Sequence, residues 1–106
     1  MLDWSGSLAY TAKMEFEWDD AESNACFVRR GFDFAHAVRV FFDPYRVIVQ
    51  DRRRDYGEDR YRLLGVIDGR AYVVVHTVRG SAIRFISARK ANGKEVADYG
   101  HNARQD

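Results

Sequence analysis

The stretch "YRLLGVIDGRAYVVVHTVRGSAIRFISARK", residues 61–90, decides the fold of this chain. It contains three runs that are rich in β-branched and aromatic residues, a composition typical of β-strands. The runs cover residues 61–67, 71–78 and 82–88. Asp68-Gly69 separates the first two runs and is the strongest short-range hairpin signal in the sequence. A second tight turn at residues 79–81 separates the last two, so the stretch predicts an antiparallel meander.

Upstream of this meander, the sequence predicts a short strand and a first helix. The segment "MEFEW" at residues 14–18 alternates apolar and polar side chains, which indicates the strand. Asp19 then caps a helix, with Glu22 at its third position in the manner of a capping box, and Gly31 ends that helix. The apolar face expected for it carries Ala21, Ala25 and Val28.

A second helix is expected after Asp33, which caps it, and before Pro44, which ends it. Its apolar face has the spacing i, i+3, i+4 and i+7, and consists of Phe34, Ala37, Val38 and Phe41. Residues 45–51 read as a further strand, and a charged connection follows up to the meander. After the meander, Asn92 and Glu95 predict the cap of a final helix.

These elements predict an α+β domain. Two N-terminal helices and one C-terminal helix surround a mostly antiparallel sheet of about four to five strands. With the helices on one face of the sheet, the other face is free to hold a ligand. The domain is expected at residues 14–100, between a loosely ordered extension at 1–13 and a polar tail at 101–106.

Composition narrows the possible classes of protein. The 106 residues suit one domain, and the single cysteine, Cys26, cannot form an internal disulfide, which predicts a cytoplasmic protein. No run of about eighteen apolar residues exists, so no membrane span is expected. The net charge of +1 hides an asymmetry. Residues 1–43 carry four Lys/Arg against eight Asp/Glu, and residues 44–106 carry thirteen against eight. The basic half indicates either an anionic ligand or a surface of mixed charge without function.

Cations interrupt the last predicted strand. Arg84 lies inside an apolar run, and Arg89 and Lys90 end it. A strand made only for a core does not need these charges, whereas one that opens onto a phosphate does. Strand alternation places Arg84 and Arg89 on opposite faces unless a bulge or strand end intervenes. Strand alternation likewise places His76 and Arg79 on opposite faces, unless Arg79 already lies in the turn.

Five segments occur in an order that resembles the BrnT toxins of bacterial type II toxin–antitoxin pairs. They read "FEWDDA", "FDFAHAVRVFFDP", "EDRYRLLG", "VVVHTVRG" and "IRFISARKA". The similarity covers about residues 14–99, and the last segment is its most specific part. It implies a fold similar to that of the RelE group, which are small α+β ribonucleases that need no metal or other cofactor. The resemblance also implies a BrnA-type antitoxin as partner. The toxin would bind operator DNA only as part of the complex with that antitoxin.

The resemblance and the chemistry of RNA cleavage together give a candidate site. Cleavage without a metal needs a base, an acid and cations that stabilise the charge on phosphorus. The predicted catalytic residues are Arg60, His76 and Arg79. The predicted substrate-binding residues are Arg84, Arg89 and Lys90. For each of them a structural role is the alternative: an ion pair for the cations, and a buried core position for His76.

The leading hypothesis is therefore an endoribonuclease toxin, but a second class stays open. Two segments depart from the family pattern, and they favour a module that binds RNA or antitoxin without turnover. The departures are Glu22, Cys26 and Arg29-Arg30-Gly31 in the first helix, and Asp55-Tyr56 ahead of Glu58-Asp59. A third possibility, action on a protein such as a topoisomerase, follows from fold similarity alone. The histidines and the cysteine show no metal-ligand spacing.

Overall fold

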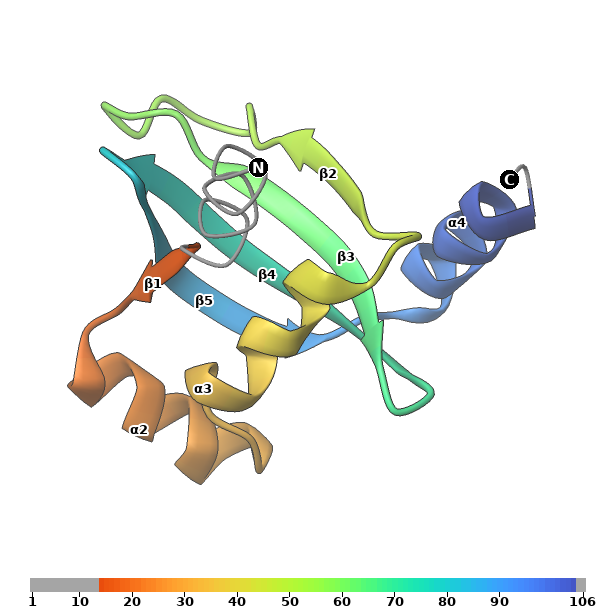
Figure 1. Cartoon of the computed structure of the whole chain (residues 1–106), viewed down its shortest axis with the longest axis horizontal. Coiled ribbons are helices and arrows are strands. Elements are labelled where there is room, and N and C mark those ends of the chain that lie inside the picture. Colours follow the sequence, from red (N-terminus) through yellow and green to blue (C-terminus); the bar gives the residue numbers. More distant parts are fainter. Residues whose placement is uncertain (1–13, 105–106) are drawn as a thin grey trace, which may run out of the picture.

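The computed structural model describes residues 14–104, which form three α-helices, a 3₁₀ helix and one five-stranded sheet (Figure 1). The elements in chain order are β1 (Glu15–Glu17), α2 (Asp20–Arg30), α3 (Phe34–Ala37), η1 (Val38–Phe42), β2 (Val47–Gln50), β3 (Tyr61–Ile67), β4 (Arg70–Arg79), β5 (Ala82–Lys90) and α4 (Gly93–Arg104). The α+β class is confirmed. The extension expected at residues 1–13 lies outside the described residues.

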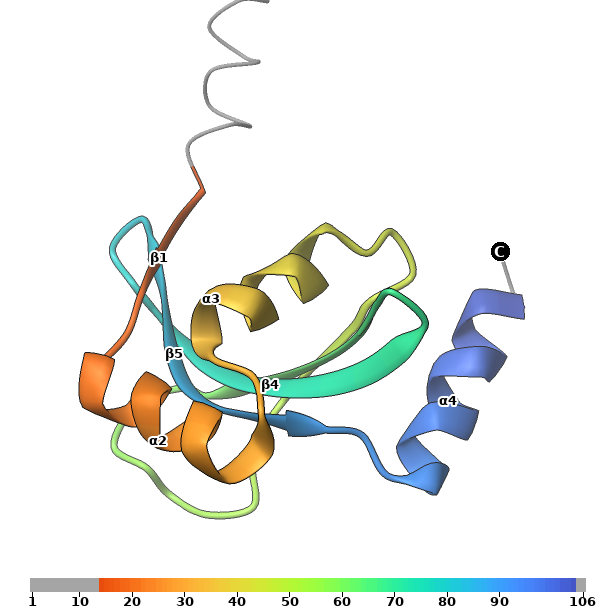
Figure 2. The same ribbon diagram turned by 90° about the horizontal axis from the view of Figure 1, so that it is seen from below.

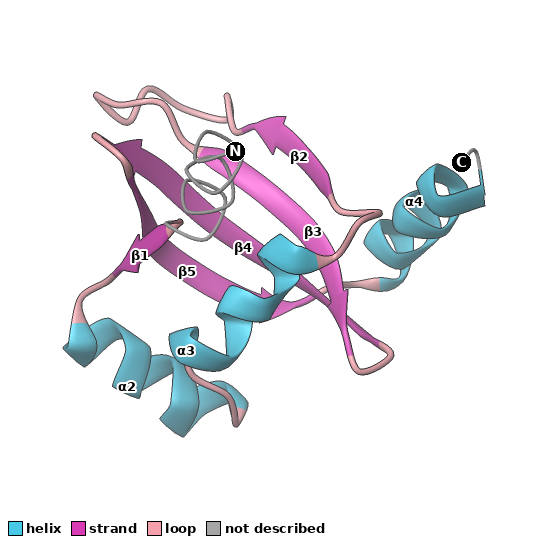
Figure 3. Cartoon of the chain, viewed as in Figure 1, coloured by secondary structure: helices cyan, strands magenta, loops and turns pink. Residues whose placement is uncertain are grey.

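The sheet has the strand order β1-β5-β4-β3-β2 (Figure 3). The meander of β3, β4 and β5 and the strand β2 pair antiparallel, as expected. β1 instead pairs parallel with β5, which makes the sheet mixed. The reason is topological, because α2, α3 and η1 lie between β1 and the rest of the sheet in the sequence. A connection of that length can return the chain to a parallel edge.

Both predicted hairpins are present. Asp68 and Gly69 have φ values of 49° and 81° at the tip of β3–β4. Positive φ at both central residues is the geometry that Asp-Gly favours, since its twist matches that of the flanking strands. Gly80, with φ of 60°, supplies the corresponding freedom in the β4–β5 turn.

Helix α2 begins and ends where the sequence predicts. The Asp19 side chain accepts a hydrogen bond from the backbone N–H of Ala21 at 2.8 Å, and Gly31 closes the helix with φ of 84°. The prediction of its buried face was wrong. Val28 is 82% exposed, and Ala21 and Ala25 are exposed too.

The buried face of α2 is instead formed by two small residues, Ser23 and Cys26. The Ser23 hydroxyl accepts a hydrogen bond from the backbone N–H of Phe34 at 3.0 Å. The Cys26 thiol donates to the carbonyl oxygen of Ala88 in β5, with an Sγ–O distance of 3.5 Å. Side-chain hydrogen bonds to the main chain thus fix the rotation of α2, and an apolar periodicity does not reveal them.

The second predicted helix is divided into α3 and the 3₁₀ helix η1. Asp33 caps it as expected, accepting from the backbone N–H of His36 at 2.9 Å. The β-branched residues Val38 and Val40 favour the α-helix only weakly, and short 3₁₀ turns are common at helix ends. Val40 also meets β3 at Gly65, where an added Cβ would lie 3.0 Å from the Cβ of Val40. The tighter 3₁₀ winding of η1 is found where Val40 lies this close to Gly65 of β3.

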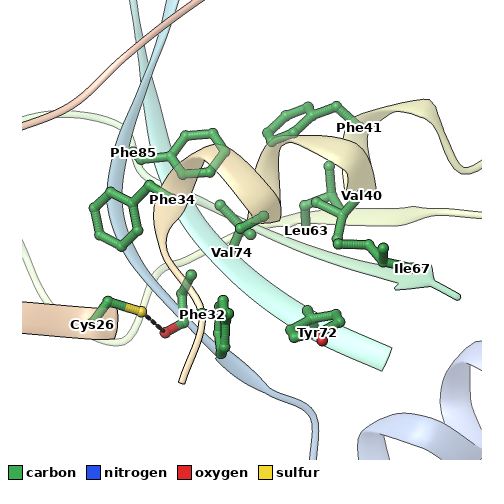
Figure 4. Packing of buried hydrophobic residues seen from close by; sticks show 12 residues of the cluster. Cys26, Phe32, Phe34, Val40, Phe41, Leu63, Ile67, Tyr72, Val74 and Phe85 are labelled. Carbon is green, nitrogen blue, oxygen red and sulfur yellow. Dashed lines mark hydrogen bonds between the residues drawn. The ribbon is translucent and has the colours of Figure 1, made fainter. Parts of the chain in front are cut away.

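The core lies between these helices and one face of the sheet (Figures 2 and 4). Its centre is the Phe85 ring of β5, which is 1% exposed and has ring neighbours from three other segments. Ring centroids of Phe34, Phe41 and Trp18 lie 5.7, 5.6 and 5.8 Å from it. Aromatic clusters of this kind stabilise a small core through edge and tilted contacts.

The C-terminal helix α4 stands apart from the other helices, at the far end of the sheet (Figure 2). Its Tyr99 hydroxyl donates to the Asp43 carboxylate at 2.6 Å, which ties it to the turn after η1. The helix continues to Arg104, so the tail expected at residues 101–106 begins as helix. No helix within residues 14–104 is long and apolar enough to cross a membrane.

Candidate functional site

The face of the sheet that points away from α3 and η1 carries a group of arginines. On β4, the buried Val74 and His76 point toward the helices. Alternation therefore directs Val75, Thr77 and Arg79 to the other face. On β3, Arg62 pairs with Val75 across the ladder, so Arg62 shares that face.

A β-bulge adds two arginines from β5. Val75 pairs with Ser87 but His76 pairs with Phe85, so Ile86 is an extra residue on β5. As a result, Arg84 lies opposite Thr77 and Arg89 lies opposite Val73. Both are thus on the open face although five positions separate them. A bulge was one of the two exceptions to strand alternation that the sequence analysis allowed for Arg84 and Arg89.

Arg60 and Arg79 meet at one end of this face through a shared carboxylate. The Glu58 side chain lies 3.2 Å from Arg60 and 3.7 Å from Arg79. The Arg60 guanidinium also stacks 4.3 Å above the ring of Tyr56. We call the five residues of this group the arginine face. They are Arg60, Arg62, Arg79, Arg84 and Arg89.

The other members of the arginine face also face carboxylates or lack a partner. Arg84 pairs with Glu17 of β1 at 3.2 Å. Arg89 forms two hydrogen bonds of 2.8 Å with Glu95 at the start of α4. The buried Nε of Arg62 has no hydrogen-bond partner among the described residues. Several of the predicted cations are thus in ion pairs, as one of the two interpretations expected.

The Arg89–Glu95 pair is the strongest of these contacts. Hydrogen bonds from Arg89, together with one from the backbone of Asn92, lower the pKa of the Glu95 carboxyl to about 2 against the opposing effect of burial. The same pairing raises the pKa of Arg89. Both groups are therefore charged at neutral pH, and α4 is fastened to the arginine face by an ion pair with bidentate geometry.

The structure does not bring His76 to this face. Its ring is 3% exposed and lies on the helix side between the rings of Phe41 and Tyr61, at 5.0 and 5.7 Å. Burial lowers its pKa, so the imidazole is neutral near pH 7. His76 packs in the core and does not join Arg79 in one catalytic group. Arg79 still belongs to β4, so the two side chains leave the strand in opposite directions, as strand alternation predicted.

Lys90 is also separated from Arg84 and Arg89. It follows Arg89 directly on β5, so its side chain points to the helix side of the strand. There it lines a hollow near the turn between α2 and α3, together with Tyr72 and Arg30. The predicted substrate-binding group is therefore divided between two faces of the sheet.

Sequence reasoning missed two acidic residues of the site and the groove beside it. Glu58 lies two residues before Arg60 and was expected as an ion-pair partner for it, whereas Glu17 and Glu95 come from other segments and were not connected to the arginines. A groove of about 370 Å³ runs from Arg62 and Val73 to α4. The sequence did indicate that Arg60 and Arg62 share a face, because residues two positions apart on a strand point to the same side of the sheet.

Comparison with known protein families shows to which family the chain belongs. A family model described as "Ribonuclease toxin, BrnT, of type II toxin-antitoxin system" matches residues 18–95. The chain belongs to the BrnT family. The match includes every residue of the arginine face and implies an RNA substrate and an antitoxin partner. No curated protein matches the chain.

In this BrnT-family chain, the arginine face is suited to bind phosphate. Arginine remains charged at any relevant pH, and its planar fork holds two phosphate oxygens at once. Arg79 and Arg84 are each held by a single contact to a carboxylate and remain partly exposed, so these two ion pairs are weak in water. Within residues 14–100, no three His, Cys, Asp or Glu side chains gather closely enough to hold a metal ion.

The buried His76 makes the stability of this BrnT-family chain sensitive to acid. Its folded pKa lies below the unfolded value, so below about pH 6.5 the unfolded state takes up a proton that the folded state resists. His76→Phe should remove this loss, which is at most about 1.4 kcal/mol per pH unit. Urea unfolding at pH 7.5 and pH 5.0 measures it.

The partly exposed His36 provides the control, because His36→Gln should keep the wild-type dependence on pH. A wild type and His76→Phe that lose equal stability between the two pH values would contradict the burial argument. The same variant should keep RNA cleavage close to that of wild type, since His76 lies on the helix side of the sheet.

Proposed function

We propose that this chain is an endoribonuclease that cleaves RNA on the arginine face without a metal ion. Family membership gives the class, a ribonuclease toxin. The observation that carries the proposal for this chain is the convergence of five arginines from β3, β4, β5 and the segment before β3 onto one open face. Such a concentration of fixed positive charge favours a polyanion.

In the proposed reaction, the 2′-hydroxyl of one nucleotide attacks the adjacent phosphorus. A new P–O2′ bond forms, the P–O5′ bond breaks, and the products carry a 2′,3′-cyclic phosphate and a 5′-hydroxyl. Negative charge on the equatorial oxygens grows in the transition state. Arg79 and Arg60, which converge on one point, stabilise that charge, and donors already aimed at it need little rearrangement.

Glu58 takes the role of general base, and His76, which the sequence offered as an acid or a base, has no part in the reaction. Its carboxylate lies between Arg60 and Arg79, at the point where the phosphate would bind. When RNA phosphate replaces the carboxylate on the two guanidinium groups, Glu58 remains within reach of the 2′-hydroxyl proton. A water that either guanidinium orients supplies the proton for the leaving 5′-oxygen.

Arg84 and Arg89 extend the same face and hold phosphates on either side of the cleaved bond. The carboxylates of Glu17 and Glu95 now contact these two arginines, and a phosphate oxygen could take the same positions. An RNA phosphate can exchange with the partly exposed Glu17 carboxylate at small cost, because such ion pairs contribute about 1 kcal/mol or less. Exchange with Glu95 costs more, since its pair with Arg89 is bidentate.

A module that binds RNA or antitoxin without turnover is the second candidate. The observation that favours it is the absence of any histidine from the arginine face among the described residues, together with the bidentate Arg89–Glu95 pair. In that case the face would bind RNA through its phosphates but would lack a base with a pKa near neutrality.

The deciding experiment is a digest of RNA by the purified chain in EDTA. A second substrate carries a single 2′-deoxynucleotide at the mapped cleavage position. The proposal expects cleavage of the first substrate with cyclic phosphate ends and none of the second at that position. Binding of both substrates without any cleavage would establish the second candidate instead.

We further propose that a BrnA-type antitoxin neutralises the chain and that operator DNA is reached only through that antitoxin. Support comes from the family, whose type II members have an antitoxin partner. A RelE-like fold and a bacterial cytoplasmic location belong to the same proposal. Co-expression with the adjacent reading frame tests it, because growth arrest by the chain alone should be relieved by the true partner.

A further inference from the structure

A second pocket lies on the opposite side of the sheet from the arginine face. It occupies about 300 Å³ near the turn between α2 and α3, a size at the lower end of pockets that hold small ligands. We call it the α2–α3 pocket. Its lining includes Phe27, Arg30, Phe32, His36, Tyr72 and Lys90.

Two cations of this pocket come from separate elements and are available to a ligand. Arg30 ends α2 and Lys90 ends β5, and both are exposed. Neither forms an ion pair with a carboxylate within residues 14–100. The nearby Asp33 carboxylate is engaged with the backbone N–H of His36 at 2.9 Å. Asp33 also lines the pocket and offsets one of the two charges, so the pocket has a net positive charge.

The floor of the pocket is aromatic and carries an unused hydroxyl group. Tyr72 is 7% exposed, and its ring lies 4.9 Å from Phe32 and 5.9 Å from His36. No described residue forms a hydrogen bond with the Tyr72 hydroxyl. The buried side-chain atoms without a hydrogen-bond partner do not include this oxygen, so the hydroxyl is open to water or to a ligand. At the pocket, Phe27 is 57% exposed.

We infer that the α2–α3 pocket binds one nucleotide, with its phosphate between Arg30 and Lys90 and its base against Phe27. Two cations and a hydroxyl donor suit phosphate oxygens, and an exposed ring provides a stacking surface for a base. A carboxylate ligand would use the cations but leave the exposed ring unused. The site goes beyond the cleavage proposed for the arginine face and does not depend on it.

The position of the pocket relates it to the path of an RNA strand. Arg89 and Lys90 are consecutive on β5 and point to opposite faces, so the end of β5 separates the two sites. An RNA strand that crosses this end would place one phosphate on Arg89 and a later nucleotide in the pocket. Lys90 therefore contributes to substrate binding as predicted, but in a different place.

The test is an NMR titration of the full chain with AMP, following the backbone amides of Phe27, His36 and Tyr72. Saturable shifts are expected at these amides, and adenosine without phosphate should bind at least about tenfold more weakly. Lys90→Ala should weaken AMP binding about tenfold, since a charge-assisted hydrogen bond is lost. Tyr72→Phe, which removes only the hydroxyl, should weaken it by a smaller factor.

Two control variants make the outcome unambiguous. Arg52→Ala removes an exposed cation that belongs neither to the α2–α3 pocket nor to the arginine face and should leave AMP binding unchanged. Arg79→Ala removes a cation of the arginine face and should likewise keep the response of the pocket. Equal binding by Lys90→Ala and wild type, or shifts confined to the arginine face, would overturn the inference while leaving the proposed cleavage untouched.

Discussion

Arg79→Ala is expected to lower the rate of RNA cleavage by about 10²- to 10³-fold, the range for removing one preorganised donor to a developing anion. The side chain is 54% exposed, and its one ion pair with a residue that the structure describes, Glu58, spans 3.7 Å. Its loss should therefore leave the free energy of unfolding nearly unchanged, since exposed pairs of this kind contribute little. Single-turnover cleavage in EDTA and thermal unfolding measure the two quantities separately.

Arg70→Ala is the matched control for this variant. Arg70 begins β4, at the opposite end of the strand that Arg79 ends, and it is also exposed. Removing it changes the net charge by the same amount, so a general electrostatic effect would lower both rates alike. Equal rates for Arg79→Ala and wild type would place the reaction away from the arginine face.

Asp43→Ala is expected to have the largest effect on stability, about 3 kcal/mol in the free energy of unfolding. Asp43 is 9% exposed and connects three elements. Its carboxylate accepts from the backbone N–H of Val66 in β3 at 2.8 Å, from the Tyr99 hydroxyl in α4 at 2.6 Å and from the backbone N–H of Tyr45 at 2.9 Å. Removal leaves these donors without their partner and detaches α4.

The same carboxylate should make stability fall in acid. Burial raises the pKa of Asp43, but the hydrogen bonds from Tyr99, Tyr45 and Val66 outweigh it and leave the pKa below its ordinary value. The folded state therefore favours the ionised form, and its stabilisation is present above about pH 4 and lost as pH falls further.

Urea unfolding at pH 7 and pH 3 tests both expectations for Asp43. The wild type should lose more stability than Asp43→Ala between the two values. Asp98→Ala serves as the control, because Asp98 is 65% exposed and its pair with Lys94 spans 3.8 Å. If Asp98→Ala and Asp43→Ala were equally stable at pH 7, the role assigned to Asp43 would be refuted.

Local sequence signals were sufficient for the hairpins and for the N-terminal ends of the helices. Asp68-Gly69 and the caps Asp19 and Asp33 act within a few residues, so their chemistry can be read directly. The buried face of α2 could not be predicted, because Ser23 and Cys26 are buried through hydrogen bonds to other elements. The parallel pairing of β1 likewise depends on the whole topology.

The candidate site was predictable as a set of residue types and only partly as an arrangement. Arginines at strand ends indicated phosphate, and the structure places Arg60, Arg79, Arg84 and Arg89 on one face. One extra residue, Ile86, decides whether Arg84 and Arg89 share that face, and alternation alone cannot reveal a bulge. The position of His76 follows from the helices packed above β4, which a strand pattern does not include.

The carboxylates on the arginine face have a consequence for how RNA binding responds to salt. Protein cations that bind nucleic acid usually release condensed ions from the phosphates, and affinity then falls steeply as salt rises. Here Glu17, Glu58 and Glu95 act as counterions built into the protein. In the proposed complex they would leave the arginines when RNA binds, but they would remain in the protein and repel the phosphates. Salt weakens that repulsion as well, so the affinity should decline less steeply than the number of arginines implies.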